Sequence, residues 1–477
     1  MTNNVDVLYF VVHLVVATLG AMHVLRFQTR SNSALLWIII LYSFPLFGLI
    51  AYIFFGVNRL LRNEEVLSSI RGIESPATPD SISATQVVDD SLSGLNCLSA
   101  NLTNIPLSRA DTCDFYQSGE RAYENMLGAI GSAEHSIYLC TYIFNYDVIG
   151  KRFADALIAA HQRGVAVYVL IDGVGQWYAH KLARPYLRRH GIAVKTFLPL
   201  TLFPPNIYIN LRNHRKLLII DRRHAFIGGL NISDAYYNDG PHRSYRDLHF
   251  QLKGPVAQQL AAVFASDWAF MSSNAPALPV EPVSDRIADS TTATSPTACR
   301  TIIDDPGRRV GHLPLIIFAA INNARTSVHI ITPYFLPNSE LIAALSAAAL
   351  RGVEVNVILP QQNNYAPVHH ASRHTHEQLL VRGVNIFYQP APFAHSKLFL
   401  IDKNYVLIGS ANFDPRSFRL NYEIGVEIFS RKFGEDMYGY IQALLRECFP
   451  ETKERLDQRS LLLRIIDGIA WLFTPLL

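Results

Sequence analysis

Two stretches, His214-Arg-Lys-Leu-Leu-Ile-Ile-Asp221 and His395-Ser-Lys-Leu-Phe-Leu-Ile-Asp402, repeat one pattern in distant parts of the chain. Each continues into a turn of small residues and an asparagine, and 17 residues separate histidine from asparagine in both copies. The apolar, β-rich residues that follow each lysine predict a strand. Because side chains two apart on a strand share a face, we expect each histidine beside its lysine.

The surroundings of the two stretches repeat as well, which predicts two related halves. The apolar segment 136–144 has a counterpart at 327–335, and a second pair lies at 163–171 and 351–359. Helical patterns precede and separate these segments. Alternating strands and helices indicate βαβ units. We therefore expect an α/β fold of two pseudo-symmetric halves, with helices flanking mixed, largely parallel sheets.

Shifts in composition predict the domain boundaries along the chain. Serine-, threonine- and proline-rich stretches separate the better-patterned segments and indicate linkers. The expected organisation is a two-span transmembrane anchor at 1–60, a linker at 61–106, the first half at 107–275, a linker at 276–298, the second half at 299–450 and an amphipathic carboxyl-terminal helix at 451–477.

The anchor is predicted from two apolar runs, 5–25 and 34–56, in which Asp6 is the only acidic residue. Each run is close to the ~20 residues that cross the hydrocarbon core of a bilayer. The short connector predicts a helical transmembrane hairpin, and the arginines after the second run slightly favour a cytoplasmic body. The alternative, two buried helices of a soluble core, is disfavoured because such long uncharged runs are rare in soluble folds.

Composition narrows the class of protein. Hydrophobic residues make up 49% of the 477 residues and charged residues 17%, which is apolar for a soluble enzyme. The net charge of +3 is too small to indicate a nucleic-acid partner by itself. The five cysteines are scattered and show no paired spacing, so neither a disulfide framework nor a zinc site is expected.

The repeated motif predicts phosphoryl chemistry. Two imidazoles on opposite sides of one phosphorus let one attack while the other protonates the leaving oxygen, and two lysines stabilise the remaining oxygens. The candidate catalytic residues are therefore the motif residues His214, Lys216, Asp221, His395, Lys397 and Asp402. The seven-residue spacing from histidine to aspartate is odd, which aims each aspartate at the opposite face of the strand and favours a structural role for it.

A nucleophilic imidazole also needs an acceptor that holds its second nitrogen. Asp247, 33 residues after His214, and Glu423, 28 residues after His395, are the candidate orienting carboxylates. Exposed charges on a strand are the alternative reading of both residues. The turns after the motif strands are candidates for binding phosphate oxygens through backbone amides and side chains, namely those of Asn231, Ser410 and Asn412.

The paired motifs resemble the two HKD signatures of the phospholipase D superfamily. The flanking Tyr245-Arg-Asp-Leu-His249, the segment Asn412-Phe-Asp-Pro-Arg-Ser-Phe418 and the two-span anchor are similar to its bacterial cardiolipin synthase branch, over nearly the whole chain. This resemblance implies transfer of a phosphatidyl group between two phosphatidylglycerol molecules, giving cardiolipin and glycerol through a phosphatidyl-histidine intermediate. It implies no metal and no organic cofactor.

The resemblance further implies location in a bacterial inner membrane, and superfamily precedent leans toward His214 as the nucleophile. Arg416, just after the second turn, is a candidate for the phosphate of the acceptor lipid. A phospholipase D that transfers the same group to water is the nearest alternative. A nuclease of the superfamily is disfavoured by the weak charge and the anchor, so no nucleic-acid partner is expected. Homo-oligomer formation stays open.

Three further segments bear on lipid or metal binding. The apolar, proline-containing stretch 198–208 either enters the bilayer or packs in the core, and the end of the chain at 460–477 is expected to be interfacial or packed. His369, His370, His374 and His376 lack matching carboxylates or cysteines, so we expect a solvated or lipid-adjacent helix there and no metal site.

Overall fold

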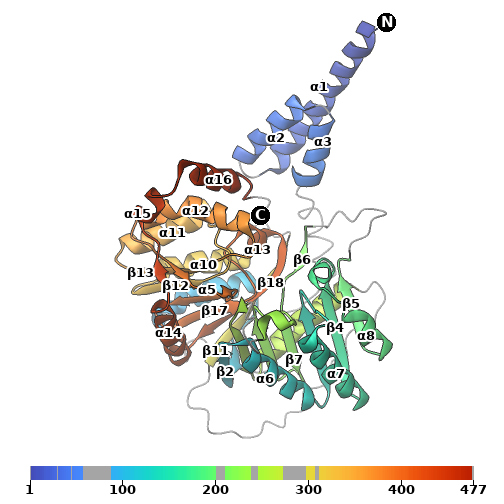
Figure 1. Ribbon diagram of the computed structural model, residues 1–477, viewed down its shortest axis with the longest axis vertical. Coiled ribbons are helices and arrows are strands. Elements are labelled where there is room, and N and C mark those ends of the chain that lie inside the picture. The colour runs from blue at the N-terminus through green and yellow to red at the C-terminus, as the bar shows by residue number, and fades with distance from the viewer. Residues whose placement is uncertain are drawn as a thin grey trace. The chain divides into compact units, whose positions relative to one another are not determined.

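The structure is a computed structural model that describes residues 2–28, 31–44, 46–56, 88–199, 210–237, 245–271, 297–306 and 311–474. The chain divides into two compact units, a helical amino-terminal unit and a larger α/β body (Figure 1). Each unit is described by itself. The predicted apolar loop at 198–208 lies almost entirely outside the described residues.

The amino-terminal unit contains one helix that is long and apolar enough to cross a membrane. This is α1 (Thr2–Phe27), over its 22 residues Asp6–Phe27. The second apolar run is divided into α2 (Ser31–Ser43), α3 (Phe47–Ala51) and η1 (Tyr52–Gly56). The 13 residues of α2 span only about 20 Å at ~1.5 Å per residue, short of a ~30 Å core. A two-helix transmembrane hairpin is therefore not confirmed.

The body contains two sheets whose strands follow the same order. In the first half the order is β2-β10-β8-β7-β3-β4-β5, and in the second it is β11-β18-β17-β16-β12-β13-β14, extended at its edges by β1 (Ser108–Ala110) and β19 (Phe449–Pro450). The first set comprises β2 (Thr112–Tyr116), β3 (Ser136–Thr141), β4 (Ala166–Asp172), β5 (Ala193–Phe197), β7 (Leu217–Ile220), β8 (His224–Gly228) and β10 (His249–Lys253). The second comprises β11 (Thr297–Asp304), β12 (Ser327–Ile331), β13 (Glu354–Pro360), β14 (Asn385–Gln389), β16 (Leu398–Ile401), β17 (Tyr405–Gly409) and β18 (Asn421–Phe429). The matching order confirms the duplicated α/β body.

The prediction of largely parallel sheets was wrong. Parallel pairing is confined to β3-β4-β5 and β12-β13-β14, and the other pairs within the two sheets' strand orders are antiparallel. The reason lies in the motif itself, since β7 and β8 are joined by only three residues, with positive φ at Asp221 and Arg222. Asp402 and Lys403 have the same conformation between β16 and β17. So short a connection joins only antiparallel neighbours.

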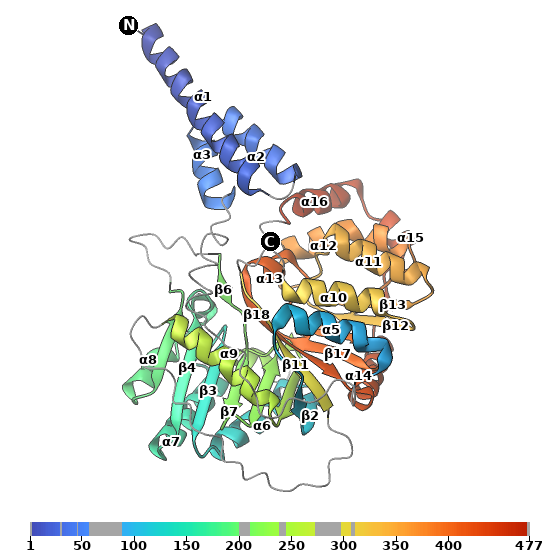
Figure 2. The ribbon, with the colours of Figure 1, turned by 180° about the vertical axis from the view of Figure 1, so that it is seen from behind.

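Helices cover the sheets on both halves, and each half has its own hydrophobic core (Figure 2). The two helices that follow β3 and β12 begin at equivalent caps, where Asp147 accepts from Gly150 N and Asn338 accepts from Leu341 N. The larger helices are α6 (Gly119–Gly131), α7 (Val148–Gln162), α9 (Val256–Phe270), α10 (His312–Asn323), α11 (Ser339–Leu350), α12 (Ala366–Leu380) and α14 (Arg431–Leu445).

Part of the predicted linker 61–106 is folded, so that boundary was wrong for its second portion. α5 (Ser93–Thr103) lies against the second half (Figure 2), and Leu92 of η3 (Asp90–Leu92) and Leu95 of α5 belong to the core of that half. The helical spacing of Leu92, Leu95, Leu98 and Leu102 was the overlooked signal. The predicted linker 276–298 ends slightly too late, because β11 begins at Thr297, and its residues before 297 lie outside the described part of the chain.

Candidate active site

The segment that leads into each motif pairs with the other half of the body. β6 (Arg212–Asn213) runs parallel to Asn421 and Tyr422, and β15 (Phe393–Ala394) runs parallel to β9 (Tyr245–Arg246). The backbone hydrogen bonding of these two strand pairs continues into the motifs. The amide of His214 donates to Tyr422 O over 3.0 Å, and the amide of His395 donates to Arg246 O over 2.7 Å.

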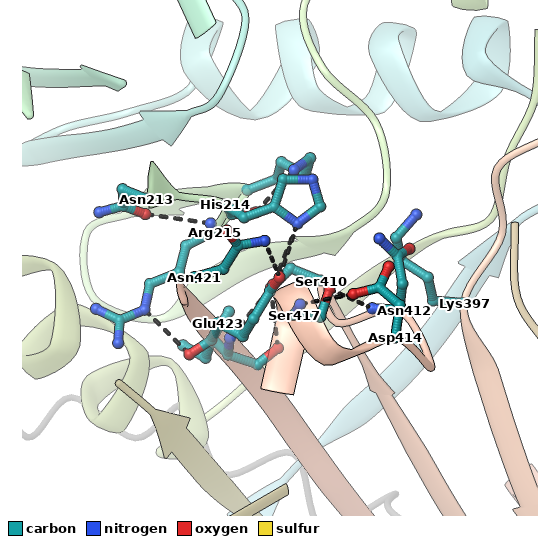
Figure 3. Close-up of polar contacts among 12 residues, drawn as sticks. Asn213, His214, Arg215, Lys397, Ser410, Asn412, Asp414, Ser417, Asn421 and Glu423 are labelled. Carbon is teal, nitrogen blue, oxygen red and sulfur yellow. Dashed lines mark hydrogen bonds and ion pairs between the residues drawn. The ribbon is translucent and has the colours of Figure 1, made fainter. Parts of the chain in front are cut away.

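Because each of these segments pairs with the opposite half, the carboxylate that contacts each motif histidine also comes from the opposite half. Nδ1 of His214 lies 3.0 and 3.2 Å from the two oxygens of Glu423 (Figure 3), and Nδ1 of His395 lies 3.0 Å from Oδ2 of Asp247. Both carboxylates proposed from the sequence therefore contact a motif histidine. Each of them contacts the histidine of the opposite half, a pairing that their spacing in sequence did not reveal.

The two motifs form a single site. Lys216 Nζ donates to the carbonyl of His214 over 2.7 Å, and Lys397 Nζ donates to the carbonyl of His395 over 2.6 Å. Burial lowers the pKa of His395 well below its usual range, and the charges of Lys397, Lys216 and His214 lower it further. Residues from both motifs thus act electrostatically on one imidazole.

The two orienting carboxylates differ in protonation. Burial alone would raise the pKa of Glu423, but His214, Lys216 and the Ser410 hydroxyl outweigh it and bring the pKa to about 2. Burial raises the pKa of Asp247 to about 7, against the opposing charges of Lys397 and Lys216. Glu423 is therefore ionised at neutral pH, whereas Asp247 holds its proton more readily than Glu423 does.

Both lysines and His214 also have depressed pKa values. Burial lowers the pKa of Lys216 to about 7 and that of Lys397 to about 8, although Glu423 and Asp247 oppose the shift. Burial lowers the pKa of His214 to about 4, again against Glu423. An anionic phosphodiester placed between these groups would reverse the trend, because negative charge favours the protonated form of each cation.

Ser410 orients a carboxylate in this structure. Its hydroxyl donates to Glu423, and its oxygen accepts from the amide of Ile424 over 3.1 Å. Asn421 Nδ2 donates to the other carboxylate oxygen of Glu423 over 3.0 Å. The prediction that the Ser410 side chain binds phosphate is therefore not supported, because both its donor and its acceptor are engaged. Its counterpart in the first half is Gly229, where a Cβ would lie 2.3 Å from Oδ2 of Asp247.

The remaining phosphate-binding candidates separate into two kinds. Asn231 is engaged internally, accepting from Ile143 N over 3.3 Å and donating to Tyr236 Oη over 3.1 Å, so the prediction that it binds phosphate is not supported either. The buried carboxamide oxygen of Asn412 has no hydrogen-bond partner among the described residues. Arg416, on the short helix α13 (Pro415–Arg419), is partly exposed, and its charge opposes the burial that raises the pKa of Tyr142. Asn412 and Arg416 thus stay candidates.

The motif aspartates lie at the far ends of the motif strands from the histidines. Asp221 accepts from the amides of Glu134, His135 and Ser136 over 2.8–3.0 Å. Asp402 accepts from the equivalent amides, of residues 325, 326 and 327, over 2.7–2.8 Å. This geometry argues against grouping the two aspartates with the residues that perform the chemistry. It supports the structural role that their odd spacing suggested.

Arg215, between the histidine and lysine of the first motif, is a further residue of the site that was not among the predicted ones. Its guanidinium is buried, donates to Asp267 on α9 over 2.5 Å and to Asp305 after β11, and Nε donates to the carbonyl of Glu423 over 3.2 Å. Arg215 therefore connects both halves beneath the site. No signal in the sequence distinguishes it, because the second motif has Ser396 at this position.

No group of three or more potential ligands that could hold a metal ion occurs in the part of the chain that the structure describes. Aromatic rings surround the histidines instead. Tyr142 lies 5.5 Å from His214 between ring centroids, and Tyr334 lies 6.4 Å from His395. With neutral imidazoles, two lysines and one firmly ionised carboxylate, the arrangement suits nucleophilic displacement at an anionic phosphorus.

Comparison with known proteins agrees with this geometry. A family model described as the cardiolipin synthase, phospholipase D-like domain matches residues 126–268 and 317–445, one match in each half. A second model, the phospholipase D-nuclease amino-terminal family, matches residues 15–56.

Curated relatives extend over almost the entire chain. A cardiolipin synthase of Geobacillus sp. is 30% identical over 446 residues, covering 92% of this chain and 88% of the relative. Cardiolipin synthase A of Pseudomonas entomophila is 30% identical over 480 residues, covering 98% and 97%. Among solved structures, phosphatidylserine synthase from Haemophilus influenzae has a TM-score of 0.62 at 14% identity, covering 80% of this chain and 100% of that one, which shows a shared fold.

Proposed function

The chain belongs to the cardiolipin synthase family with phospholipase D-like domains, and we propose that it transfers a phosphatidyl group between two phosphatidylglycerol molecules, giving cardiolipin and glycerol. The observation that carries this proposal is that each motif histidine is held by a carboxylate from the other half. This arrangement presents two imidazoles at one site, each with Nδ1 held by a carboxylate, and Nε2 of His395 also lies 3.2 Å from Lys397 Nζ. Two imidazoles are what a two-step displacement with one covalent intermediate requires.

In this proposal His214 is the nucleophile. Glu423, ionised and held by Ser410 and Asn421, contacts Nδ1 of His214 with both oxygens and favours the tautomer with Nε2 unprotonated. Nε2 attacks the phosphorus of the first phosphatidylglycerol, and the bond from phosphorus to the glycerol oxygen breaks. His395 donates a proton from Nε2 to that oxygen, so glycerol leaves as a neutral molecule.

The second displacement reverses these roles for the acceptor. Nε2 of His395 takes the proton of a hydroxyl on the second phosphatidylglycerol, whose oxygen attacks the phosphorus while the phosphorus–nitrogen bond to His214 breaks. Lys216 and Lys397 stabilise the non-bridging oxygens in both steps. The phosphate charge also offsets the two lysines that depress the pKa of His395, which lets this imidazole hold the proton it must donate.

Product analysis tests the proposal directly. The full chain, reconstituted in vesicles that contain labelled phosphatidylglycerol, should release one glycerol for each cardiolipin formed. Phosphatidic acid as the main product would identify the hydrolytic alternative, with water as acceptor. Absence of both products would contradict phosphatidyl transfer altogether.

Single histidine variants test the assigned roles. His214→Ala and His395→Ala should each lower turnover by about 10⁴-fold or more, because either loss removes a covalent or a proton-transfer step. His214→Ala should form no labelled phosphatidyl-enzyme. His395→Ala should retain a small labelled fraction after acid quenching, since its nucleophile is intact. The reverse labelling pattern would exchange the two roles.

We extend the proposal to the membrane. The family and the apolar helix α1 indicate membrane association. In the finer arrangement both apolar runs, 5–25 and 34–56, cross the inner membrane of a bacterium as a hairpin, the second as the broken series α2-α3-η1, and the body is cytoplasmic. An impermeant maleimide should then label a Ser31→Cys variant in intact cells, whereas the exposed Cys97 of the body should react only after permeabilisation. Labelling of Cys97 in intact cells would reverse the orientation.

A further inference from the structure

The carboxyl-terminal helix α16 (Leu461–Leu472) lies on the surface of the body with a charged side chain turned inward and its large apolar side chains exposed. Its inner side holds Asp467, only 3% exposed, which accepts from His370 Nδ1 over 2.7 Å and from Arg459. The ring of His374 on α12 stacks on Trp471 at 4.7 Å. Apart from Arg464, which pairs with Asp457, the exposed side chains of α16 and of the residue after it are apolar, namely Leu461, Leu462, Leu463, Ile465, Ile466, Ile469, Trp471, Leu472 and Phe473.

This placement of polar and apolar side chains is the opposite of that in an ordinary surface helix. A surface helix ordinarily buries its apolar stripe and turns polar residues to water. Here the helix is attached to the body through a buried ionic contact, and its large aliphatic side chains are left exposed, with Leu462 at 67% and Leu472 at 68%. A continuous exposed apolar surface of this kind marks a site that another apolar phase covers.

The helix adjoins the candidate active site. Ala470 of α16 packs against a small cluster formed by Leu336, Val368 and Ala371, and Tyr334 packs against the same cluster. The ring of Tyr334 in turn lies 6.4 Å from the ring of His395. The small apolar cluster and the ring of Tyr334 therefore separate the apolar helix from a motif histidine.

The first half contributes a matching feature. Trp177 and Tyr178, on η4 (Gly175–Tyr178), are 74% and 67% exposed. The ring of Tyr178 lies 6.3 Å from that of Tyr142, which lies 5.5 Å from His214. His214 is thus linked to exposed aromatic side chains through Tyr142, and His395 is linked to α16 through Tyr334 and the small apolar cluster. We call the exposed apolar side chains of α16 together with Trp177 and Tyr178 the docking face.

We propose that the docking face inserts into the headgroup region of the lipid bilayer and holds the two histidines at the depth of the lipid phosphodiesters. This inference rests on the proposed function, because a phosphatidyl donor and acceptor both reach the site from a bilayer. Tryptophan and tyrosine favour the membrane interface, and amphipathic helices lie in its plane. A protein partner on this face would cover the surroundings of the histidines and obstruct lipid entry, so the bilayer is the occupant that the geometry favours.

Lipid quenching tests the contact without reference to catalysis. The full chain is reconstituted in vesicles that contain bromine-labelled phospholipid, and the fluorescence of Trp471 is obtained as the difference between the unsubstituted chain and Trp471→Phe. We expect bromolipid to quench this difference signal by about half or more at interfacial depth. An unquenched Trp471 would overturn the inference. A second copy of the chain would be the occupant if, in addition, the Leu462→Glu/Ile469→Glu variant sedimented in detergent as a smaller species than the unsubstituted chain.

A kinetic comparison tests the consequence for turnover. Leu462→Glu/Ile469→Glu should lower the transfer rate in vesicles by about tenfold or more. Both side chains are exposed on the protein and buried in the bilayer when it docks, and glutamate removes that apolar burial. With short-chain phosphatidylglycerol dispersed in detergent, the same variant should match the unsubstituted chain. The matched control is Leu350→Glu. Leu350 is 74% exposed and ends α11, at the edge of the sheet opposite the motif histidines. This variant should match the unsubstituted chain in both assays.

The outcomes separate this inference from the proposed function. If no cardiolipin forms in either assay while Trp471 is quenched, docking stands and the reaction is misassigned. If cardiolipin forms and the double variant is equally active in vesicles and detergent, the reaction stands and the docking face is refuted. A loss of activity in detergent as well would show that the substitutions damage the fold, and quenching of Trp471 would then decide alone.

Discussion

The two halves of the body have the same strand order but different orienting groups. Glu423 contacts His214 with two oxygens and is itself held by Ser410 and Asn421. Asp247 contacts His395 with one oxygen, while its other oxygen accepts from the amide of Leu248 over 2.8 Å. At the position equivalent to Ser410 the first half has Gly229, against which the Asp247 carboxylate packs directly.

This difference shows how a duplicated fold yields a site with two distinct roles. A permanently ionised carboxylate suits the imidazole that must stay unprotonated at Nε2 until it attacks. A carboxylate whose pKa is near 7 tolerates an imidazole that alternates between donor and acceptor of a proton. The symmetry of the backbone places the histidines, and the side chains around each carboxylate separate their functions.

The largest expected effect comes from neutralising each carboxylate with an isosteric amide. Glu423→Gln should lower kcat by about 10³- to 10⁴-fold, because the amide permits the wrong tautomer of a nucleophilic imidazole. Asp247→Asn should cost less, about 10- to 10²-fold, because Asp247 contacts its imidazole with one oxygen and is the weaker anion of the two. Initial rates on dispersed phosphatidylglycerol measure both values. Equal losses would remove the distinction between the two halves.

The motif aspartates should instead behave identically in both halves. Asp221→Ala and Asp402→Ala should each lower the free energy of unfolding by about 1–3 kcal/mol, because each substitution leaves several backbone amides without an acceptor. The kcat of the folded enzyme should be unchanged. Chemical denaturation in detergent measures the effect, and Glu435→Ala, which breaks the exposed ion pair with Arg431, should change it by less than about 0.5 kcal/mol. A large fall in kcat would make the aspartates part of the chemistry.

The pH dependence of kcat/KM should reveal the weaker carboxylate. Asp247 loses its charge as pH falls through about 7, and Lys216 and Lys397 lose theirs as pH rises through about 7 and about 8. We therefore expect a maximum near neutrality. The acid limb should approach about tenfold per pH unit before it levels off at the loss seen in Asp247→Asn, and the alkaline limb, where two lysines lose their charge, should be steeper. Asp247→Asn should abolish the acid limb and keep the alkaline limb. An acid limb that survives this substitution would assign it to another group.

The smallest expected effect makes the second half resemble the first. Ser410→Gly removes the hydroxyl that donates to Glu423, which should raise the pKa of that carboxyl and lower kcat by roughly two- to tenfold. Because the pKa starts at about 2, Glu423 should still be ionised at neutral pH, so the loss should grow as the medium is acidified. A pH-independent loss would indicate displaced geometry. No loss at all would contradict the role of Ser410.

Much of this site could be predicted because its signals are local. The histidine and lysine of each motif lie two apart on extended chain, and the spacing to the aspartates predicted that these would face elsewhere. Asp247 and Glu423 were found because each follows a motif turn by a similar distance. The side chains of Ser410 and Asn231 were proposed to bind phosphate, because a sequence does not show that a neighbouring carboxylate or amide already engages them.

The sequence by itself therefore determined the duplication, the α/β character of each half, and the identity of the histidines, lysines and candidate carboxylates, since all of these depend on periodicity and short spacings. Only the tertiary structure decided that Glu423 holds His214 across 209 residues and that Asp247 holds His395 across 148. The physical reason is that β6 and β15 each add to a segment of the opposite half. Hydrogen bonds between segments so far apart depend on how two folded halves meet, which no local pattern encodes.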